Sequence, residues 1–277
     1  MLPTILGMDS YILMAVIGFA AAFLTGFLRR KKYGFVPIDL VAMLCAGIAG
    51  LLLGSKLLFI ITMIPEIIQN FGWEIIEQRV INGGLVFYGG LLGAMYAMYL
   101  VAKSMKRDVM SMMNFTIPCF AAFHFFGRIG CFLDGCCHGV AWEHGVPCNA
   151  PFKCFPIQLV EAAGILIIFA VLMWLENEGF KKAKKIPLVP IYFLLYGVLR
   201  FVDEIWRGDV LRGVTVFKID YFTSAQNSAS ITFSLSTSQI ISLILIVFSA
   251  VYLYRLAKRG RGEAEIPEKA EAKEEDQ

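Results

Sequence analysis

Seven apolar stretches, each long enough to cross a lipid bilayer as a helix, follow one another along the chain and limit its fold more than any other feature. They cover residues 11–28, 40–65, 81–102, 109–126, 157–175, 186–202 and 231–254. The chain is 58% hydrophobic and 17% charged, whereas a soluble domain is about one-quarter charged. We therefore predict an all-α polytopic membrane protein with about seven transmembrane helices and no sizeable soluble domain.

Basic residues gather at one side of the predicted membrane. Fifteen lysines and arginines follow the first, third, fifth and seventh stretches, whereas five lie in the opposite loops. The larger group comprises Arg29, Arg30, Lys31, Lys32, Lys103, Lys106, Arg107, Lys181, Lys182, Lys184, Lys185, Arg255, Lys258, Arg259 and Arg261. Because basic loops stay in the cytoplasm, the N-terminus is predicted outside and the C-terminus inside. This topology accounts for the basic clusters, and no nucleic-acid partner is predicted.

The two ends of the chain lead to different expectations. No cationic segment precedes the first apolar stretch and no small-residue cleavage site follows it, so we expect residues 1–28 to be a retained span. After Gly262 the sequence is charged and lacks aromatic residues, which predicts disorder. The predicted organisation is a seven-helix transmembrane domain over residues 1–260 and a disordered cytoplasmic tail over residues 261–277.

Polar residues from five different stretches fall at a similar predicted depth near the outer boundary. At about 1.5 Å per residue, Arg128 lies about 28 Å above the cytoplasmic edge of its span and Arg200 about 20 Å above it. Lys56, Tyr88 and Glu161 also occupy the outer halves of their stretches. Because a charge within hydrocarbon costs a few kcal/mol, we expect these side chains to face the bundle interior and be paired. The alternative is a ring of snorkelling anchors.

The segment from Phe126 to Gly139 combines an arginine and an aspartate with four glycines and three cysteines. Glycines allow a backbone or a ligand to approach closely. Arg128 and Asp134 follow a long uncharged run, so the segment is either a snorkelling arginine before a cysteine-stapled turn, or a site. His124 lies one turn before Arg128, and we expect it to be a hydrogen-bonded packing residue.

Charged side chains share a helical face in two further motifs. Arg200, Glu204 and Arg207 lie on one face, so Glu204 can hold both arginines and leave donors for a phosphate. Gln158 and Glu161 are neighbours at the start of the fifth stretch, where the helix dipole alone would also favour a carboxylate.

Tyr88 stands between two pairs of glycines at the start of the third stretch, residues 83–84 and 89–90. Close packing of helices through small residues accounts for these glycines. It does not account for a phenol placed between them.

Four cysteines crowd the predicted outer loop: Cys136, Cys137, Cys148 and Cys154. In an oxidising exterior they favour disulfides, for which three pairings exist. A zinc site with the loop histidines is the less favoured alternative, because the adjacent cysteines lack the usual two-residue spacer. No metal is predicted.

Several of these motifs together resemble the bacterial prolipoprotein diacylglyceryl transferase family. The matching residues occur in the same order along nearly the whole chain, with seven spans. They are Tyr11, Gly83-Gly84, Phe87, Gly89-Gly90-Leu91, Gly127-Arg128-Ile129-Gly130, Phe132, Gly135, Gly139, Pro156, Gln158-Leu159, Glu161, Arg200, Glu204, Arg207 and Ser238-Gln239-Ile240.

The resemblance implies transfer of a diacylglyceryl group from phosphatidylglycerol to the lipobox cysteine of a prolipoprotein, in a bacterial cytoplasmic membrane and without a cofactor. We assign Tyr88, Arg128 and Arg200 as catalytic residues, with Tyr88 as the base or positioning group. The expected substrate-binding residues are Tyr11, Lys56, Gly89, Gly90, Gly127, Gly130, Asp134, Gly139, Gln158, Glu161, Glu204 and Arg207.

Some positions depart from the family pattern. The family often has histidine at Tyr88, arginine at Lys56, asparagine at Cys131 and Asp134, and glutamate at Cys136. These departures leave open a related enzyme with a different acceptor. A lipid or solute transporter, and a thiol-redox protein using its adjacent cysteines, are rival interpretations, although the sequence lacks the inverted repeats expected of many transporters.

Overall fold

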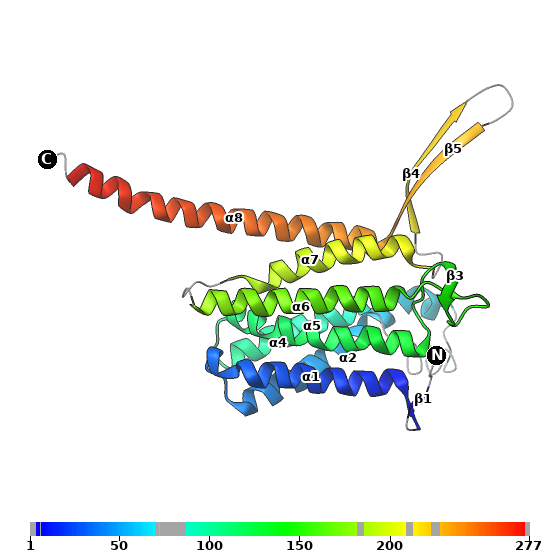
Figure 1. Ribbon diagram of the computed structural model, residues 1–277, viewed down its shortest axis with the longest axis horizontal. Helices are drawn as coiled ribbons and strands as arrows, with labels where there is room; N and C mark the ends of the chain where they lie inside the picture. The colour runs from blue at the N-terminus through cyan, green and yellow to red at the C-terminus, as the bar shows by residue number, and fades with distance from the viewer. Residues whose placement is uncertain are drawn as a thin grey trace. The chain divides into compact units, whose positions relative to one another are not determined.

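The computed structural model describes residues 4–5, 7–69, 72, 87–181, 186–208, 213–222 and 228–274 (Figure 1). Its helices are α1 (Ser10–Tyr33), α2 (Pro37–Gln69), α4 (Phe87–Ser104), α5 (Val109–Asp134), α6 (Ile157–Lys181), α7 (Leu188–Asp203) and α8 (Thr237–Glu274). Five of the described helices, α1, α2, α5, α6 and α8, are long and apolar enough to cross a membrane. The chain is therefore a largely helical polytopic membrane protein, and the prediction of seven spans and of their orientation stays a prediction.

Short strands join these helices. The described strands are β1 (Thr4–Ile5), β2 (Met8–Asp9), β3 (Ala141–Val146), β4 (Gly213–Phe222) and β5 (Ser228–Ser236). Strands β1 and β2 pair antiparallel, and so do β4 and β5. A 3-10 turn, η2 (Glu204–Trp206), continues α7.

Two predicted boundaries differ from the structure. The seventh stretch was expected to be helical from residue 231, but residues 231–236 belong to β5 and α8 begins at Thr237. Apolar and hydroxyl residues alternate in this segment, and a period of two favours a strand. The fourth apolar stretch ends at Phe126, but α5 continues to Asp134, because Gly127 and Gly130 lower helix propensity without ending a helix. The predicted disorder of residues 261–277 stays a prediction, although α8 is drawn to Glu274.

The chain divides into two compact units, whose boundaries fall within α1 and α5. The first comprises residues 1–20 and 120–277, and the second comprises residues 21–119. In the first unit α7 packs between α6 and α8 (Figure 1). Gly164 and Gly197 allow these contacts, because a Cβ atom at Gly164 would overlap Leu199, and one at Gly197 would crowd Ile246.

The second unit is built on close contact between α2 and α4. A Cβ atom at Gly54 would collide with the carbonyl oxygen of Gly89, and one at Gly93 with that of Gly50. Small residues spaced in this way let two helix backbones approach, which is how membrane helices commonly associate. The apolar core of this unit is formed by Phe35, Leu40, Met43, Met98, Ala102, Met112 and Phe115.

Candidate functional site

Arg128 of α5 is held by a carboxylate that is almost completely removed from solvent. Its Nη2 atom lies 2.9 Å from Oε1 of Glu161 on α6, and the Glu161 side chain is 1% exposed. The hydroxyl of Tyr196 on α7 donates a second hydrogen bond of 3.1 Å to the same oxygen. Three helices therefore fix the position of one guanidinium group, as the cost of an unpaired buried charge requires.

Arg200 and Arg207 share one carboxylate at the end of α7. Nη1 of Arg200 lies 2.5 Å from Oε2 of Glu204, and Nε of Arg207 lies 3.9 Å from the same oxygen. The Nη2 group of Arg200 also donates to Oγ of Ser238 on α8, at 3.0 Å. Glu204 contacts both arginines as predicted, but the three residues do not share a helical face, because α7 ends at Asp203, Glu204 lies in η2 and the Arg207 backbone is extended.

Among the described residues, the buried polar atoms of this unit without a hydrogen-bond partner include Arg128 Nε, Gln158 Oε1 and Asp203 Oδ2. The amide nitrogen of the same Gln158 side chain, Nε2, donates a hydrogen bond of 2.7 Å to the carbonyl oxygen of Cys136. Buried donors and acceptors are normally satisfied, since an unmade hydrogen bond costs about 1–3 kcal/mol. Unsatisfied polar atoms beside a guanidinium group are typical of a site that awaits a polar ligand.

A backbone network joins the loop after α5 to the end of α7. The N–H of Val140 donates to the carbonyl oxygen of Trp206 at 2.9 Å, and the N–H of Gly208 donates to that of His138 at 3.1 Å. Gly139 lies inside this network, and a Cβ atom there would collide with Phe155 and crowd the Trp206 carbonyl. The absence of a side chain at Gly139 therefore allows the backbone hydrogen bonds that position Arg207.

Tyr11, Gly127 and Gly130 lie on or beside α5. The Tyr11 ring packs on Gly130, where a Cβ atom would come within 3.2 Å of it. Gly127 differs, because no described atom lies within 4 Å of its Cβ position. Asp134 ends the helix, and its carbonyl oxygen accepts a hydrogen bond of 3.1 Å from the Asn149 side chain.

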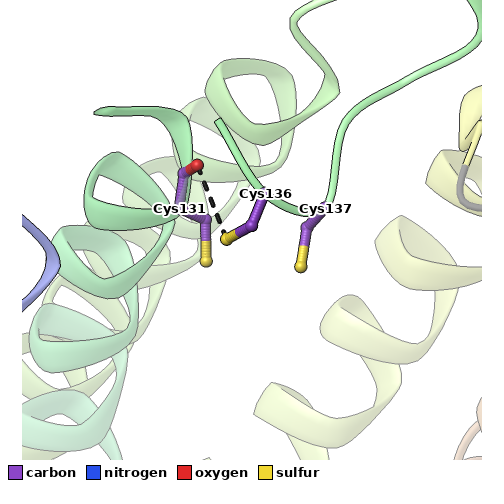
Figure 2. A group of neighbouring side chains, drawn as sticks. All are labelled: Cys131, Cys136 and Cys137. Carbon is purple, nitrogen blue, oxygen red and sulfur yellow. Dashed lines mark hydrogen bonds between the residues drawn. The ribbon is translucent and has the colours of Figure 1, made fainter. Parts of the chain in front are cut away.

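The outer cysteines separate into a disulfide and a group of thiols. Cys148 and Cys154 form a disulfide, whereas Cys136 and Cys137 are free. The Sγ atoms of Cys131, Cys136 and Cys137 lie within 4.8 Å of one another. Figure 2 shows them together, with Cys136 donating to the Cys131 carbonyl oxygen.

The two adjacent thiols titrate differently. The pKa of the Cys137 thiol lies below its usual range because of hydrogen bonds with Cys131 and Cys136, with nearby guanidinium groups adding to the effect. The pKa of the Cys136 thiol lies above its usual range because hydrogen bonds with Cys131 and Cys137, together with burial, favour its protonated form.

Comparison with known proteins decides the family. A family model described as prolipoprotein diacylglyceryl transferase matches residues 2–255. The chain belongs to the prolipoprotein diacylglyceryl transferase family.

Curated relatives carry the name phosphatidylglycerol–prolipoprotein diacylglyceryl transferase. The protein of Clostridium tetani is 32% identical over 84% of this chain and 87% of its own length. The protein of Cupriavidus metallidurans is 30% identical over 91% of this chain and 90% of its own length. A protein of Clostridium perfringens, named as a second such transferase, is 26% identical over 92% of this chain and 93% of its own length.

The other predicted site residues of this transferase-family chain lie in the second unit. Gly89 and Gly90 pack on α2, where Cβ atoms would collide with Gly54 and Ser55. Lys56 lies over the ring of Phe59, with 5.6 Å between its Nζ atom and the ring centroid. Tyr88 lies on α4, and its side chain is outside the described part of the structure.

Sequence reasoning missed two side chains of the first unit. Asp203 stands beside Glu204 inside the motif that drew attention to the arginines, whereas Tyr196 stands one helical turn before that motif. A tyrosine in an apolar helix gives no signal of its own, because packing explains it equally well. His124 was correctly predicted to be a hydrogen-bonded packing residue, since it is buried and its Nδ1 atom lies 3.2 Å from the Tyr192 hydroxyl.

Proposed function

We propose that this protein transfers the diacylglyceryl group of phosphatidylglycerol to the lipobox cysteine thiol of a prolipoprotein, at the outer face of a bacterial cytoplasmic membrane. A carbon–sulfur bond forms, the carbon–oxygen bond to the phosphate breaks, and glycerol 1-phosphate leaves. The thiol proton is released. The membership of the chain in the transferase family and the names of its relatives support this reaction.

The single observation that carries the proposal is the buried Arg128–Glu161 pair with its unused Nε donor. Glu161 fixes the plane of the guanidinium group while leaving a donor for a phosphate oxygen. Arginine suits this task because its donors form a rigid fork that matches phosphate. In the proposed mechanism Arg128 binds the phosphodiester and stabilises the charge that develops on it as the carbon–oxygen bond breaks.

Arg200 and Arg207 form the second part of the proposed clamp. Because Glu204 and Ser238 restrain Arg200, little conformational entropy is lost when the lipid arrives. Gly127 offers space without a side chain beside Arg128, and we assign this space to the glycerol backbone of the lipid. Tyr11, Gly130, Asp134, Gly139 and Gln158 remain proposed substrate-binding residues.

The proton of the acceptor thiol needs a group that takes it or orients it, because the thiolate is the nucleophile. We assign this role to Tyr88, with Lys56, Gly89 and Gly90 as proposed neighbours on the acceptor side. The seven predicted spans, with the N-terminus outside, would put these groups and the arginines at the outer leaflet.

A reconstituted assay tests the proposal. Purified protein is incubated with phosphatidylglycerol and a peptide that carries a lipobox cysteine, and the peptide is weighed by mass spectrometry. We expect the mass of one diacylglyceryl group on the cysteine peptide, no addition to a matched serine peptide, and release of glycerol 1-phosphate. Release of that phosphate without peptide modification would point to a different acceptor and overturn the assigned one.

A further inference from the structure

Three thiols that the proposed reaction does not use lie together at the end of α5. Cys131 is the fourth-last residue of that helix, whereas Cys136 and Cys137 lie in the loop that follows (Figure 2). Their Sγ atoms all lie within 4.8 Å of one another. A zinc ion bound at about 2.3 Å to each thiolate would hold its sulfur atoms about 3.8 Å apart. Shortening the distances between the Sγ atoms by about 1 Å would therefore place the three thiols at the separations found around a bound zinc ion.

The local backbone holds this arrangement without a metal. Gly135 has a φ of 84° and Cys137 a φ of 55°, and these left-handed residues turn the chain back over the last turn of α5. The N–H of Gly135 donates to the carbonyl oxygen of Cys131 at 3.0 Å. Gln158 then fixes the loop to α6 through the carbonyl oxygen of Cys136. The three thiols are thus preorganised by bonds that do not involve their sulfur atoms.

The charge around the cluster suits thiolate ligands. A divalent ion with three thiolates carries a net charge of −1, which is costly near the membrane unless cations are close. The guanidinium groups of Arg207 and Arg128 interact electrostatically with Cys137. Soft thiolate ligands select zinc and similar ions over magnesium or calcium.

We propose that Cys131, Cys136 and Cys137 form a binding site for a thiophilic divalent cation such as Zn²⁺, with a fourth coordination position left for an external ligand. No further histidine, cysteine or acidic side chain joins this group within the described residues. Zinc sites with three protein ligands and one open position are typical of catalysis, whereas structural zinc sites are closed by four.

The open coordination position could be filled by the acceptor of the proposed reaction, the lipobox cysteine thiol. This part of the inference rests on the proposed function. A thiol that binds the ion loses its proton to solvent and remains a nucleophile as a bound thiolate. Its sulfur then attacks the glyceryl carbon, the carbon–oxygen bond to the phosphate breaks, and the three protein thiolates keep the ion. The cluster would in this way remove the thiol proton, and Tyr88 would then orient the acceptor rather than act as its base.

Cobalt binding tests the site without any measurement of activity. Purified, metal-free protein in detergent, reduced with a phosphine, is titrated with Co²⁺, and the thiolate-to-cobalt charge-transfer absorption is followed. We expect one equivalent to bind, and binding to weaken at least about tenfold in Cys131→Ser, Cys136→Ser and Cys137→Ser. Cys45→Ser and Cys119→Ser are matched controls and should bind as the unaltered protein does. The Cys148→Ser/Cys154→Ser variant should also keep the signal.

Two results would overturn the site. One is a charge-transfer signal that is absent, or that survives removal of all three cluster cysteines together. The other is a disulfide between two of these cysteines in protein purified without reductant, detected by alkylation and mass spectrometry. Circular dichroism of each variant shows whether a lost signal reflects lost folding.

A lipobox peptide added to the cobalt protein tests the fourth position. We expect the cysteine peptide to change the cobalt spectrum and the serine peptide to leave it unchanged. If cobalt binds but neither peptide changes the spectrum, the acceptor role of the ion is wrong while the site stands. If the cysteine peptide changes the spectrum but no transfer occurs, the proposed function is wrong instead.

Discussion

A buried arginine in each compact unit illustrates the difference between packing and a site. Arg29 of the second unit is 2% exposed, and its Nη1 group donates to the carbonyl oxygen of Phe115 at 2.8 Å. It also lies over the rings of Tyr33 and Phe115. Arg128 of the first unit keeps 15% of its side chain exposed, and its Nε atom has no partner among the described residues. Arg128 is the more exposed of the two arginines, and its buried Nε atom has unused hydrogen-bonding capacity.

Gly127 differs in the same way from the glycines between α2 and α4. The space at Gly50, Gly54, Gly89 and Gly93 is filled by the backbone of the facing helix. The space at Gly127 is empty of described atoms. A glycine that faces a backbone explains how two helices associate, whereas a glycine that meets no described atom is free of that packing role.

Replacement of each arginine by lysine is the strongest test of this comparison. Arg128→Lys keeps the charge opposite Glu161 but removes the forked donors, so diacylglyceryl transfer should fall about 100- to 1,000-fold. Arg29→Lys is the matched control, and its transfer rate per folded molecule should stay within about twofold of the unaltered protein. Rates are measured in the peptide assay and normalised to folded protein. Equal losses in the two variants would contradict the distinction.

Removal of the Tyr88 hydroxyl tests whether the second unit contributes a group that takes part in the reaction. If Tyr88 takes or orients the thiol proton, Tyr88→Phe should slow transfer about 100-fold with little change in thermal stability. The replacement of Tyr99, on the same helix, by phenylalanine serves as the control. Unaltered turnover in Tyr88→Phe would remove the tyrosine from the mechanism and strengthen the case for a metal-bound thiolate.

Addition of a methyl group to two glycines separates packing from ligand space. Gly93→Ala forces α2 and α4 apart, so the free energy of unfolding should fall by about 1–3 kcal/mol. Gly127→Ala meets no described atom, so stability should be kept while the apparent KM for phosphatidylglycerol rises. Thermal unfolding in detergent and steady-state kinetics measure the two effects. A stability loss at Gly127 as large as that at Gly93 would mean that its space is part of the packing.

The smallest effect is expected at Tyr196. Tyr196→Phe removes one hydrogen bond to Glu161 but leaves the pair with Arg128 intact, so stability should fall by about 1 kcal/mol. Transfer should fall less than about tenfold, because the phenol acts through Glu161 on the position of Arg128. Phe193→Leu on the same helix controls for general loosening of α7. A loss of transfer comparable to that of Arg128→Lys would give the phenol a direct part in the reaction.

The sequence predicted the helical membrane class, the contact of Glu204 with two arginines, and a similar depth for Arg128 and Glu161 with their charges paired. These predictions succeeded because depth in a membrane follows from residue counting, and buried charges have few ways to be satisfied. It did not predict that Tyr196 joins Glu161, because an aromatic residue in an apolar helix has many equivalent partners. Nor did it predict that Cys131 joins Cys136 and Cys137, since that contact depends on two left-handed residues after α5.

The peptide-group bonds around Gly139 have an evolutionary consequence. Val140 and Gly208 donate to carbonyl oxygens across the loop, so main-chain atoms set the separation between the end of α5 and Arg207. The side chains in the turn, such as those of Cys136 and Cys137, are therefore not needed to maintain this separation. Substitutions there can change the chemical groups that the turn presents while the arginines proposed to bind phosphate keep their positions. The turn is therefore a place where new acceptor chemistry can be selected at little structural risk.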